Sequence, residues 1–188
     1  MRWLAIMGVL ALGLVGTAGA ARAQAADDEL PAGRIGAGIG LRAGLGRLGS
    51  DFGLGLVGSI EAGYHPTSRG QRVSLGVSWA VRRGWFGYDD EASVAGSLHL
   101  TEFDFGGRMR IAITPSGRRF LTLGAGASLL RTNVPVPPDD ERTYWGGYGT
   151  VGVEFFVLGY LMNSEIRYGP IGAGPASISF MAGVSLGT

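Results

Sequence analysis

Apolar side chains alternate with small or polar ones along most of the chain. In the C-terminal segment 176–187, one set of alternate positions is apolar throughout: Ile178, Phe180, Ala182, Val184 and Leu186. The intervening positions are small or polar, among them Ser177, Ser179, Gly183 and Ser185. Successive side chains of a β-strand point to opposite faces, so this period of two predicts a strand with one apolar face.

Eight segments show this pattern, and they predict an all-β fold. The predicted strands span about 34–46, 52–65, 71–82, 98–114, 119–131, 144–158, 162–168 and 176–187. The alternation changes phase near Leu98 and Leu100, which predicts a bulge or an exposed extension there. An even number of such segments is typical of an eight-stranded antiparallel up-and-down transmembrane β-barrel, which we expect over residues 34–188.

The connections between these segments differ in length. Three short ones carry turn residues, at 66–70, 115–118 and 159–161. On the opposite side, 83–96 and 132–143 are longer and more polar, whereas 47–51 and 169–175 are short. Short periplasmic turns and longer extracellular loops are typical of outer-membrane barrels.

The N-terminus predicts export. A basic start at Arg2 is followed by an apolar run over 4–15 and a small-x-small site at 21–23. These features predict a signal peptide over 1–23, cleaved before Gln24, and a short segment 24–33 ahead of the barrel. The alternative is a membrane anchor, but the apolar run is shorter than the roughly 20 residues that a spanning helix needs.

Composition agrees with a membrane barrel and argues against several other classes. Lys and Cys are absent, and removal of residues 1–23 leaves 14 Arg and 15 acidic residues, so nothing favours nucleic-acid binding. Of the 35 Gly, 31 follow residue 23, too many for a helical protein. No segment after residue 23 has 18 uninterrupted apolar residues, which excludes a helical span there.

Nine charged residues fall on the face opposite the apolar one. In a membrane barrel this face lines the lumen, and the residues are Arg42, Glu61, Glu102, Asp104, Arg108, Arg110, Glu154, Glu165 and Arg167. An eight-stranded barrel is only wide enough for side chains to fill it, and buried charges must pair. We therefore expect an Arg–carboxylate network that packs the lumen. A narrow channel for small solutes or ions is the alternative, and a secreted lipocalin-like barrel with an apolar ligand cavity is a second.

Aromatic and acidic residues cluster near one end of the predicted strands. The aromatic residues predict a belt at the membrane interface, formed by Trp79, Trp85, Phe86, Tyr88, Tyr144 and Trp145; the alternative is the core of a soluble barrel. Two acidic triplets lie in the long loops, namely Asp89, Asp90, Glu91, Asp139, Asp140 and Glu141. We interpret them as solvated loops. A divalent-cation site is the alternative, because carboxylate oxygens suit Ca²⁺ or Mg²⁺, but neither triplet has the ligand spacing of an EF-hand calcium site.

Motifs for catalysis are weak. Residues 183–187 match the G-x-S-x-G sequence of a nucleophile elbow, but no His follows them. The segment Gly36–Gly40 lacks the helix and acidic partner of a dinucleotide loop. His65 and His99 are expected at opposite barrel ends, which leaves only a Ser/His site around His99 as an enzymatic alternative. We expect no enzyme activity, no cofactor and no metal site.

The eight alternating segments, the short turns and the longer loops resemble the small outer-membrane barrels of the outer membrane protein A and X type. The resemblance covers about residues 34–188 and is one of pattern, and the chain ends in Thr188 where many members end in an aromatic residue. It implies a cell outer membrane location, with outer-membrane lipid and lipopolysaccharide as partners. It also implies transient contact with the barrel-assembly machinery and periplasmic chaperones. The expected role is structural or surface interaction.

Overall fold

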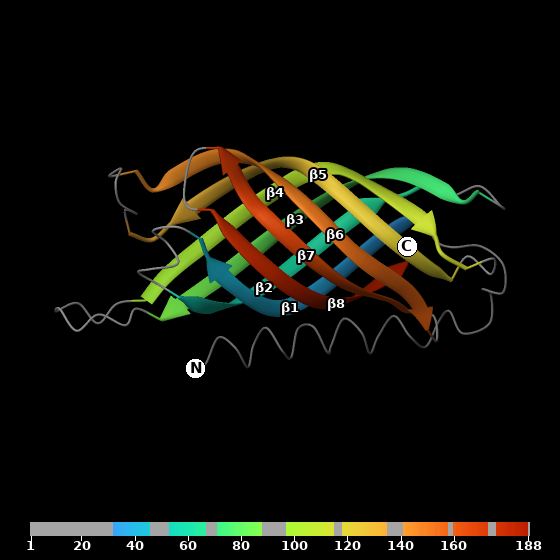
Figure 1. Cartoon of the computed structure of the whole chain (residues 1–188), viewed down its shortest axis with the longest axis horizontal. Helices are drawn as coiled ribbons and strands as arrows, with labels where there is room; N and C mark the ends of the chain where they lie inside the picture. Colours follow the sequence, from blue (N-terminus) through green and yellow to red (C-terminus); the bar gives the residue numbers. More distant parts are fainter. Residues whose placement is uncertain are drawn as a thin grey trace.

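The computed structural model describes residues 32–45, 53–66, 71–87, 97–114, 118–134, 141–157, 160–172 and 176–187. The expected signal peptide and Tyr88 lie outside these described residues. Eight strands form one closed antiparallel barrel in sequence order, in which β8 pairs with β1 (Figure 1). The strands are β1 (Gly33–Gly44), β2 (Leu54–Tyr64), β3 (Val73–Gly87), β4 (Ser97–Ala112), β5 (Arg119–Thr132), β6 (Thr143–Val157), β7 (Tyr160–Gly172) and β8 (Ser177–Gly187).

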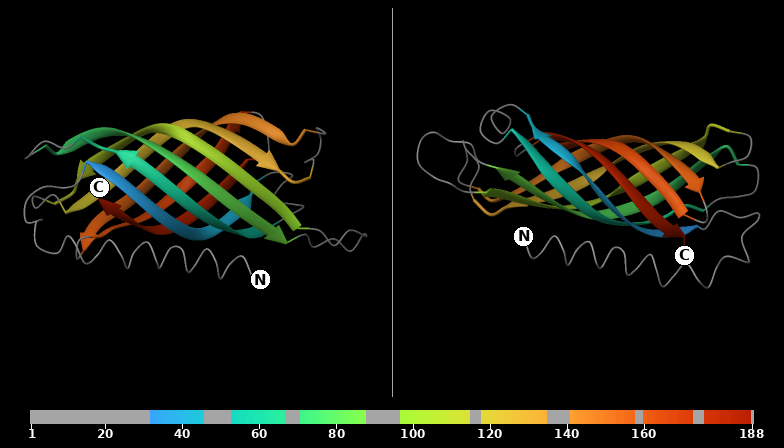
Figure 2. Two further views of the ribbon diagram at one scale, coloured as in Figure 1. Left: turned by 180° about the vertical axis from the view of Figure 1, so that it is seen from behind. Right: turned by 90° about the horizontal axis from the view of Figure 1, so that it is seen from below.

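The strands run obliquely around a long barrel, with no sheet edge left open among them (Figure 2). Arg34 of β1 pairs with Gly187 of β8, so the chain enters and leaves the barrel at the same end, here called the termini end. The opposite end, here called the loop end, contains the last residues of β1, β3, β5 and β7. Only residues 158–159 separate β6 from β7 at the termini end, whereas residues 133–142 separate β5 from β6 at the loop end.

The alternation of the sequence corresponds to side chains that point into the barrel and side chains that point outward. Large apolar side chains point outward and stay exposed, for example Ile39 at 66%, Leu75 at 68% and Phe105 at 65%. Soluble monomers rarely expose a contiguous apolar surface of this extent. The apolar face thus surrounds the barrel, which is the reverse of what a barrel with an apolar ligand cavity requires.

Two strands are longer than the sequence predicts. β3 continues through the expected loop to Gly87, because residues 83–87 pair in register with 97–101 of β4. β7 extends from Tyr160 to Gly172 on both sides of the predicted 162–168, paired with β6 and β8.

The bulge predicted near Leu98 and Leu100 is wrong. β4 keeps one register with β3 along its length, and both leucines are buried inside the barrel, in phase with Glu102. They look out of phase in the sequence only because they are apolar residues on the inward face. The irregularity lies instead between β6 and β7, where the register shifts at Gly147 and Gly149.

Candidate functional site in the barrel interior

The interior holds a dense set of charged side chains. Six guanidinium groups and five carboxylates are buried among the described residues: Arg34, Arg42, Arg82, Arg108, Arg110 and Arg167, with Glu61, Glu102, Asp104, Glu154 and Glu165. They come from six of the eight strands, namely β1, β2, β3, β4, β6 and β7. Ser128 of β5 accepts a hydrogen bond from Arg167. With all eleven groups ionised, the interior has one more positive than negative charge. The cost of burying these charges then depends on how well the guanidinium groups and carboxylates pair.

The half of the network towards the loop end is built on Glu102 and Asp104. Arg42 donates to Glu102, and Arg82 donates to Asp104. Arg167 lies between these carboxylates: its Nη2 is 3.0 Å from Asp104 Oδ1, and its Nη1 is 3.4 Å from Glu102 Oε2. Arg167 also donates to Ser128 and stacks 5.1 Å from the ring centroid of Tyr148. Each carboxylate here holds two guanidinium groups.

The half towards the termini end is built on Glu154 and Glu61. Arg34 Nη1 lies 2.5 Å from Glu154 Oε1, and Arg110 Nε lies 2.6 Å from Glu154 Oε2. Arg108 is within 3.7 Å of Glu61 and 3.6 Å of Glu154. Asn163 donates to Glu61 at 3.2 Å. Glu154 is therefore the shared acceptor of this half.

Glu165 joins the two halves. Its Oε1 accepts a hydrogen bond from Arg82 Nη2 at 2.8 Å, and its Oε2 accepts one from Arg108. Each half without Glu165 has three guanidinium groups and two carboxylates, so this one carboxylate supplies negative charge to both. The eleven side chains form one connected network through it.

Glycine on the inward face makes room for these long side chains. A Cβ at Gly84 would lie 3.1 Å from a terminal nitrogen of Arg42, and one at Gly63 would lie 3.1 Å from Arg34 Nε. Small cavities remain, and two of them, each with room for about one water molecule, are lined by both Glu61 and Glu165. The described interior is a packed core and not an open tube.

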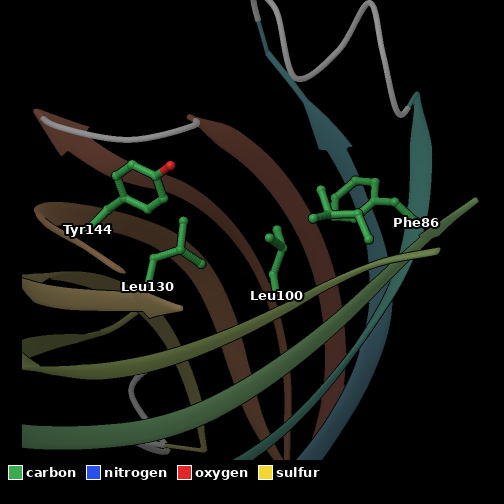
Figure 3. Packing of buried hydrophobic residues seen from close by; sticks show 5 residues of the cluster. Phe86, Leu100, Leu130 and Tyr144 are labelled. Carbon is green, nitrogen blue, oxygen red and sulfur yellow. The ribbon is translucent and has the colours of Figure 1, made fainter. Parts of the chain in front are cut away.

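An apolar layer closes the interior at the loop end. Phe86, Leu98, Leu100, Leu130 and Tyr144 form one buried cluster there (Figure 3). Tyr144 also donates from its hydroxyl to the Glu141 carbonyl at 2.6 Å. Leu100 and Leu130 are 0% exposed, so this layer separates the charge network from the loop-end solvent.

The termini end contains a buried histidine. His65 follows β2 and is 0% exposed, and neither of its ring nitrogens has a hydrogen-bond partner among the described residues. Burial, together with the Arg110 and Arg34 guanidiniums, lowers the pKa of His65 from 6.5 to about 3. His65 is therefore neutral at any physiological pH.

The predicted aromatic belt needs a correction. Trp79 and Trp145 are outward and exposed at 51% and 66%, and Trp85 occupies an outward position of β3. Phe86 and Tyr144 instead point into the lumen and form the apolar layer. Their neighbours Trp85 and Trp145 take the outward positions, and the alternation of a strand then turns Phe86 and Tyr144 inward. Of the acidic loop residues, Glu141 is exposed and the other five lie outside the described residues.

The alternation also indicates two further interior residues that the prediction did not include. Arg34 and Arg82 belong to the interior network but were not assigned to it. Both occupy the inward phase of their strands: Arg34 is the first residue of the predicted segment 34–46, and Arg82 is the last residue of 71–82. Following the inward phase to the ends of these two segments would have found them.

A serine–histidine contact lies on the outer wall at the loop end. Ser97 Oγ is 2.8 Å from His99 Nε2, and Asn133 Oδ1 accepts from the His99 backbone N–H at 2.8 Å. A histidine acting as general base is normally held by an acceptor at its other nitrogen. His99 Nδ1 has no hydrogen-bond partner among the described residues. His65 is at the other end of the barrel, so the structure does not bring the two histidines together.

No group of three or more His, Cys, Asp or Glu side chains among the described residues has a geometry that could hold a metal ion. No helix within the described ranges is long and apolar enough to cross a membrane.

Comparison with known proteins gives similarity in structure only. No protein-family model matches the sequence, and no curated protein matches it. Neisserial surface protein A superposes with a TM-score of 0.56 at 20% identity, over 84% of this chain and 97% of that one. Ail, the attachment invasion locus protein of Yersinia pestis, gives 0.54 at 12% identity, over 81% and 97%. The chain has the fold of the small outer-membrane β-barrels.

The expected eight-stranded barrel of the outer membrane protein A and X type is thus confirmed as the fold. The outer membrane enzyme PagL shares this fold, with a TM-score of 0.50 at 10% identity over 82% of this chain and 99% of that one. Because an enzyme shares the fold, catalytic activity has to be judged from the residues of this chain.

Proposed function

We propose that this protein is an integral outer-membrane barrel with a closed lumen, whose role is structural or surface interaction. The observation that supports it best is the combination of an exposed apolar wall with an interior packed by paired charges. A lipid bilayer covers such a wall, and a filled interior leaves no path for solutes. Signal peptide cleavage after residue 23, periplasmic chaperones and the barrel-assembly machinery complete the proposed route to the cell outer membrane.

Fractionation of expressing cells tests location, and gel mobility of the membrane fraction with and without boiling tests the closed barrel. We expect outer-membrane recovery, a heat-dependent mobility shift and a mature N-terminus at Gln24 by mass spectrometry. A soluble periplasmic protein without a shift would contradict the proposal.

A narrow channel is the second candidate, supported by the two water-sized cavities beside Glu61 and Glu165. Planar-bilayer conductance distinguishes it from a packed lumen. A packed lumen predicts no steady current for the wild type and an increase in Arg108→Ala, because Arg108 contacts three carboxylates. Arg119→Ala, in an exposed side chain, is the matched control. Steady wild-type current would favour the channel, and no change in Arg108→Ala would contradict the plug.

We propose no enzymatic activity. The Ser97–His99 contact lacks a hydrogen-bond acceptor at His99 Nδ1 among the described residues. Ester hydrolysis of phospholipid and lipid A by the purified protein is the test, with Ser97→Ala as the control. Turnover that is lost in Ser97→Ala would overturn this proposal.

A further inference from the structure

The outward wall of the barrel has very few charges. Among the residues of the eight described strands, only three Arg or carboxylate side chains occupy outward positions: Arg83, Arg119 and Arg131. Arg119 begins β5 at the termini end, whereas Arg83 and Arg131 lie near the loop end. A charged side chain on a lipid-facing wall is costly except at the membrane interface. These three arginines are therefore expected to lie at the interface or to have a polar partner.

Arg83 and Arg131 flank Thr101 on the outward wall. Both pair in register with Thr101 of β4, Arg83 from β3 and Arg131 from β5. Their backbones are therefore two strand spacings apart, about 10 Å. Arg83 Nη1 donates to Thr101 Oγ1 at 2.7 Å, which fixes its guanidinium against the wall and leaves four N–H groups for other acceptors.

The height of Arg83 matches the boundary of the bilayer. Arg83 is ten residues from Val73, the first residue of β3. At about 3.3 Å per residue and a tilt near 45°, this separation is roughly 23 Å of height, close to the apolar band of about 25 Å in such barrels. The Arg83 guanidinium thus lies where lipid head groups meet the hydrocarbon region, and Arg131 lies two strands away near the same end of the barrel.

The wall directly beneath them is apolar. Val81, Phe103 and Leu129 are register partners two residues nearer the termini end. Phe103 and Val81 are exposed at 48% and 36%. The exposed indole of Trp145 lies beside Leu129 in the register of β5 and β6. A bound molecule would meet two cations above and a hydrocarbon surface below.

We propose that Arg83 and Arg131 form a binding site for the phosphate groups of the outer-leaflet glycolipid, lipopolysaccharide, with Thr101 between them. Guanidinium groups bind phosphate with paired, charge-assisted hydrogen bonds. The acyl chains of the same lipid lie along Val81, Phe103 and Leu129. This inference rests on the proposed outer-membrane function, since it needs the loop end to face the outer leaflet.

The test measures binding of lipid A, the phosphorylated anchor of lipopolysaccharide, to the full mature barrel in detergent micelles by native mass spectrometry. The variants are Arg83→Gln, Arg131→Gln and the double variant, and Arg119→Gln is the matched control from the termini end. We expect the double variant to lose about tenfold or more of the wild-type affinity and Arg119→Gln to retain it. Equal loss in Arg119→Gln, or no loss in the double variant, would overturn the site.

Two further probes identify the ligand. Lipid A without its phosphates should bind the wild type no better than it binds the double variant, and inorganic phosphate alone should bind weakly to both. Equal affinity for phosphatidylglycerol would show a general anionic-lipid preference and contradict the glycolipid assignment. The heat-dependent gel shift is measured on every sample: its absence from the wild type refutes the barrel function, whereas its presence with no binding refutes only this site.

Discussion

The two ends of the barrel interior are closed by different kinds of interaction. At the loop end, Leu98, Leu100 and Leu130 pack with Phe86 and Tyr144 into a layer that contains almost no polar atoms. At the termini end, the described interior has Arg34, Arg110 and the unpartnered His65 instead. One end excludes water by apolar packing and the other by paired charge and a neutral imidazole.

This difference shows what a small barrel needs in order to have a charged core. A guanidinium–carboxylate network gains most when water is kept away from it, but every member must then be paired. The half beneath the apolar layer has its carboxylates each shared by two guanidiniums, with a hydroxyl and an aromatic ring as further partners of Arg167. The half at the termini end depends more on Glu154 alone.

The largest effect should come from breaking the link between the halves. Glu165→Gln leaves six guanidinium groups against four carboxylates and removes the shared acceptor of Arg82 and Arg108. Removing one partner of a buried pair costs about 3–5 kcal/mol, so the free energy of unfolding should fall by about that amount. Urea unfolding in micelles measures it. The exposed Glu141→Gln is the control, and equal stability of the two variants would show that Glu165 does not join the network.

A smaller effect should come from opening the apolar layer. Leu130→Ala leaves a cavity inside the barrel and should lower the free energy of unfolding by about 2–4 kcal/mol. Leu123→Ala is the matched control on the same strand, because Leu123 points outward and is 38% exposed. Lipid or detergent fills the space that Leu123→Ala creates, so its effect should be clearly smaller. If both variants lose equal stability, the layer does not seal the loop end.

The sequence predicted which side chains point into the barrel and which point outward, because side chains alternate along a strand with a single period of two residues. It assigned nine charged residues to the inward face, and all nine are buried in the structure. It failed where an inward residue is apolar: Leu98 and Leu100 looked like a change of phase, and Phe86 and Tyr144 looked like interface residues. The alternation alone does not show that a barrel places an apolar layer inside one of its ends.

The pairing within the network could not be read from the sequence. Glu165 meets Arg82 and Arg108 from strands that are not its neighbours in the sheet. Such contacts cross the lumen, and they depend on the stagger of the closed sheet and on side chains long enough to span it. Alternation predicts that a residue points inward, but it does not predict the residue that it meets there.

The smallest effect concerns the termini end and its response to acid. The pKa of His65 is about 3 in the folded barrel and 6.5 in an unfolded chain, so below pH 6.5 the unfolded state binds a proton that the native state does not. Stability is therefore lost as the pH falls from 6.5 towards 3, by about 1.4 kcal/mol per pH unit at most. His65→Gln cannot take up this proton, so its unfolding free energy should fall less steeply between pH 6.5 and 5 than that of the wild type. Leu123→Ala, which removes no titratable group, should leave the wild-type slope nearly unchanged. A His65→Gln slope equal to that of the wild type would mean that the imidazole reaches water, and the termini end would then be open where the loop end is closed.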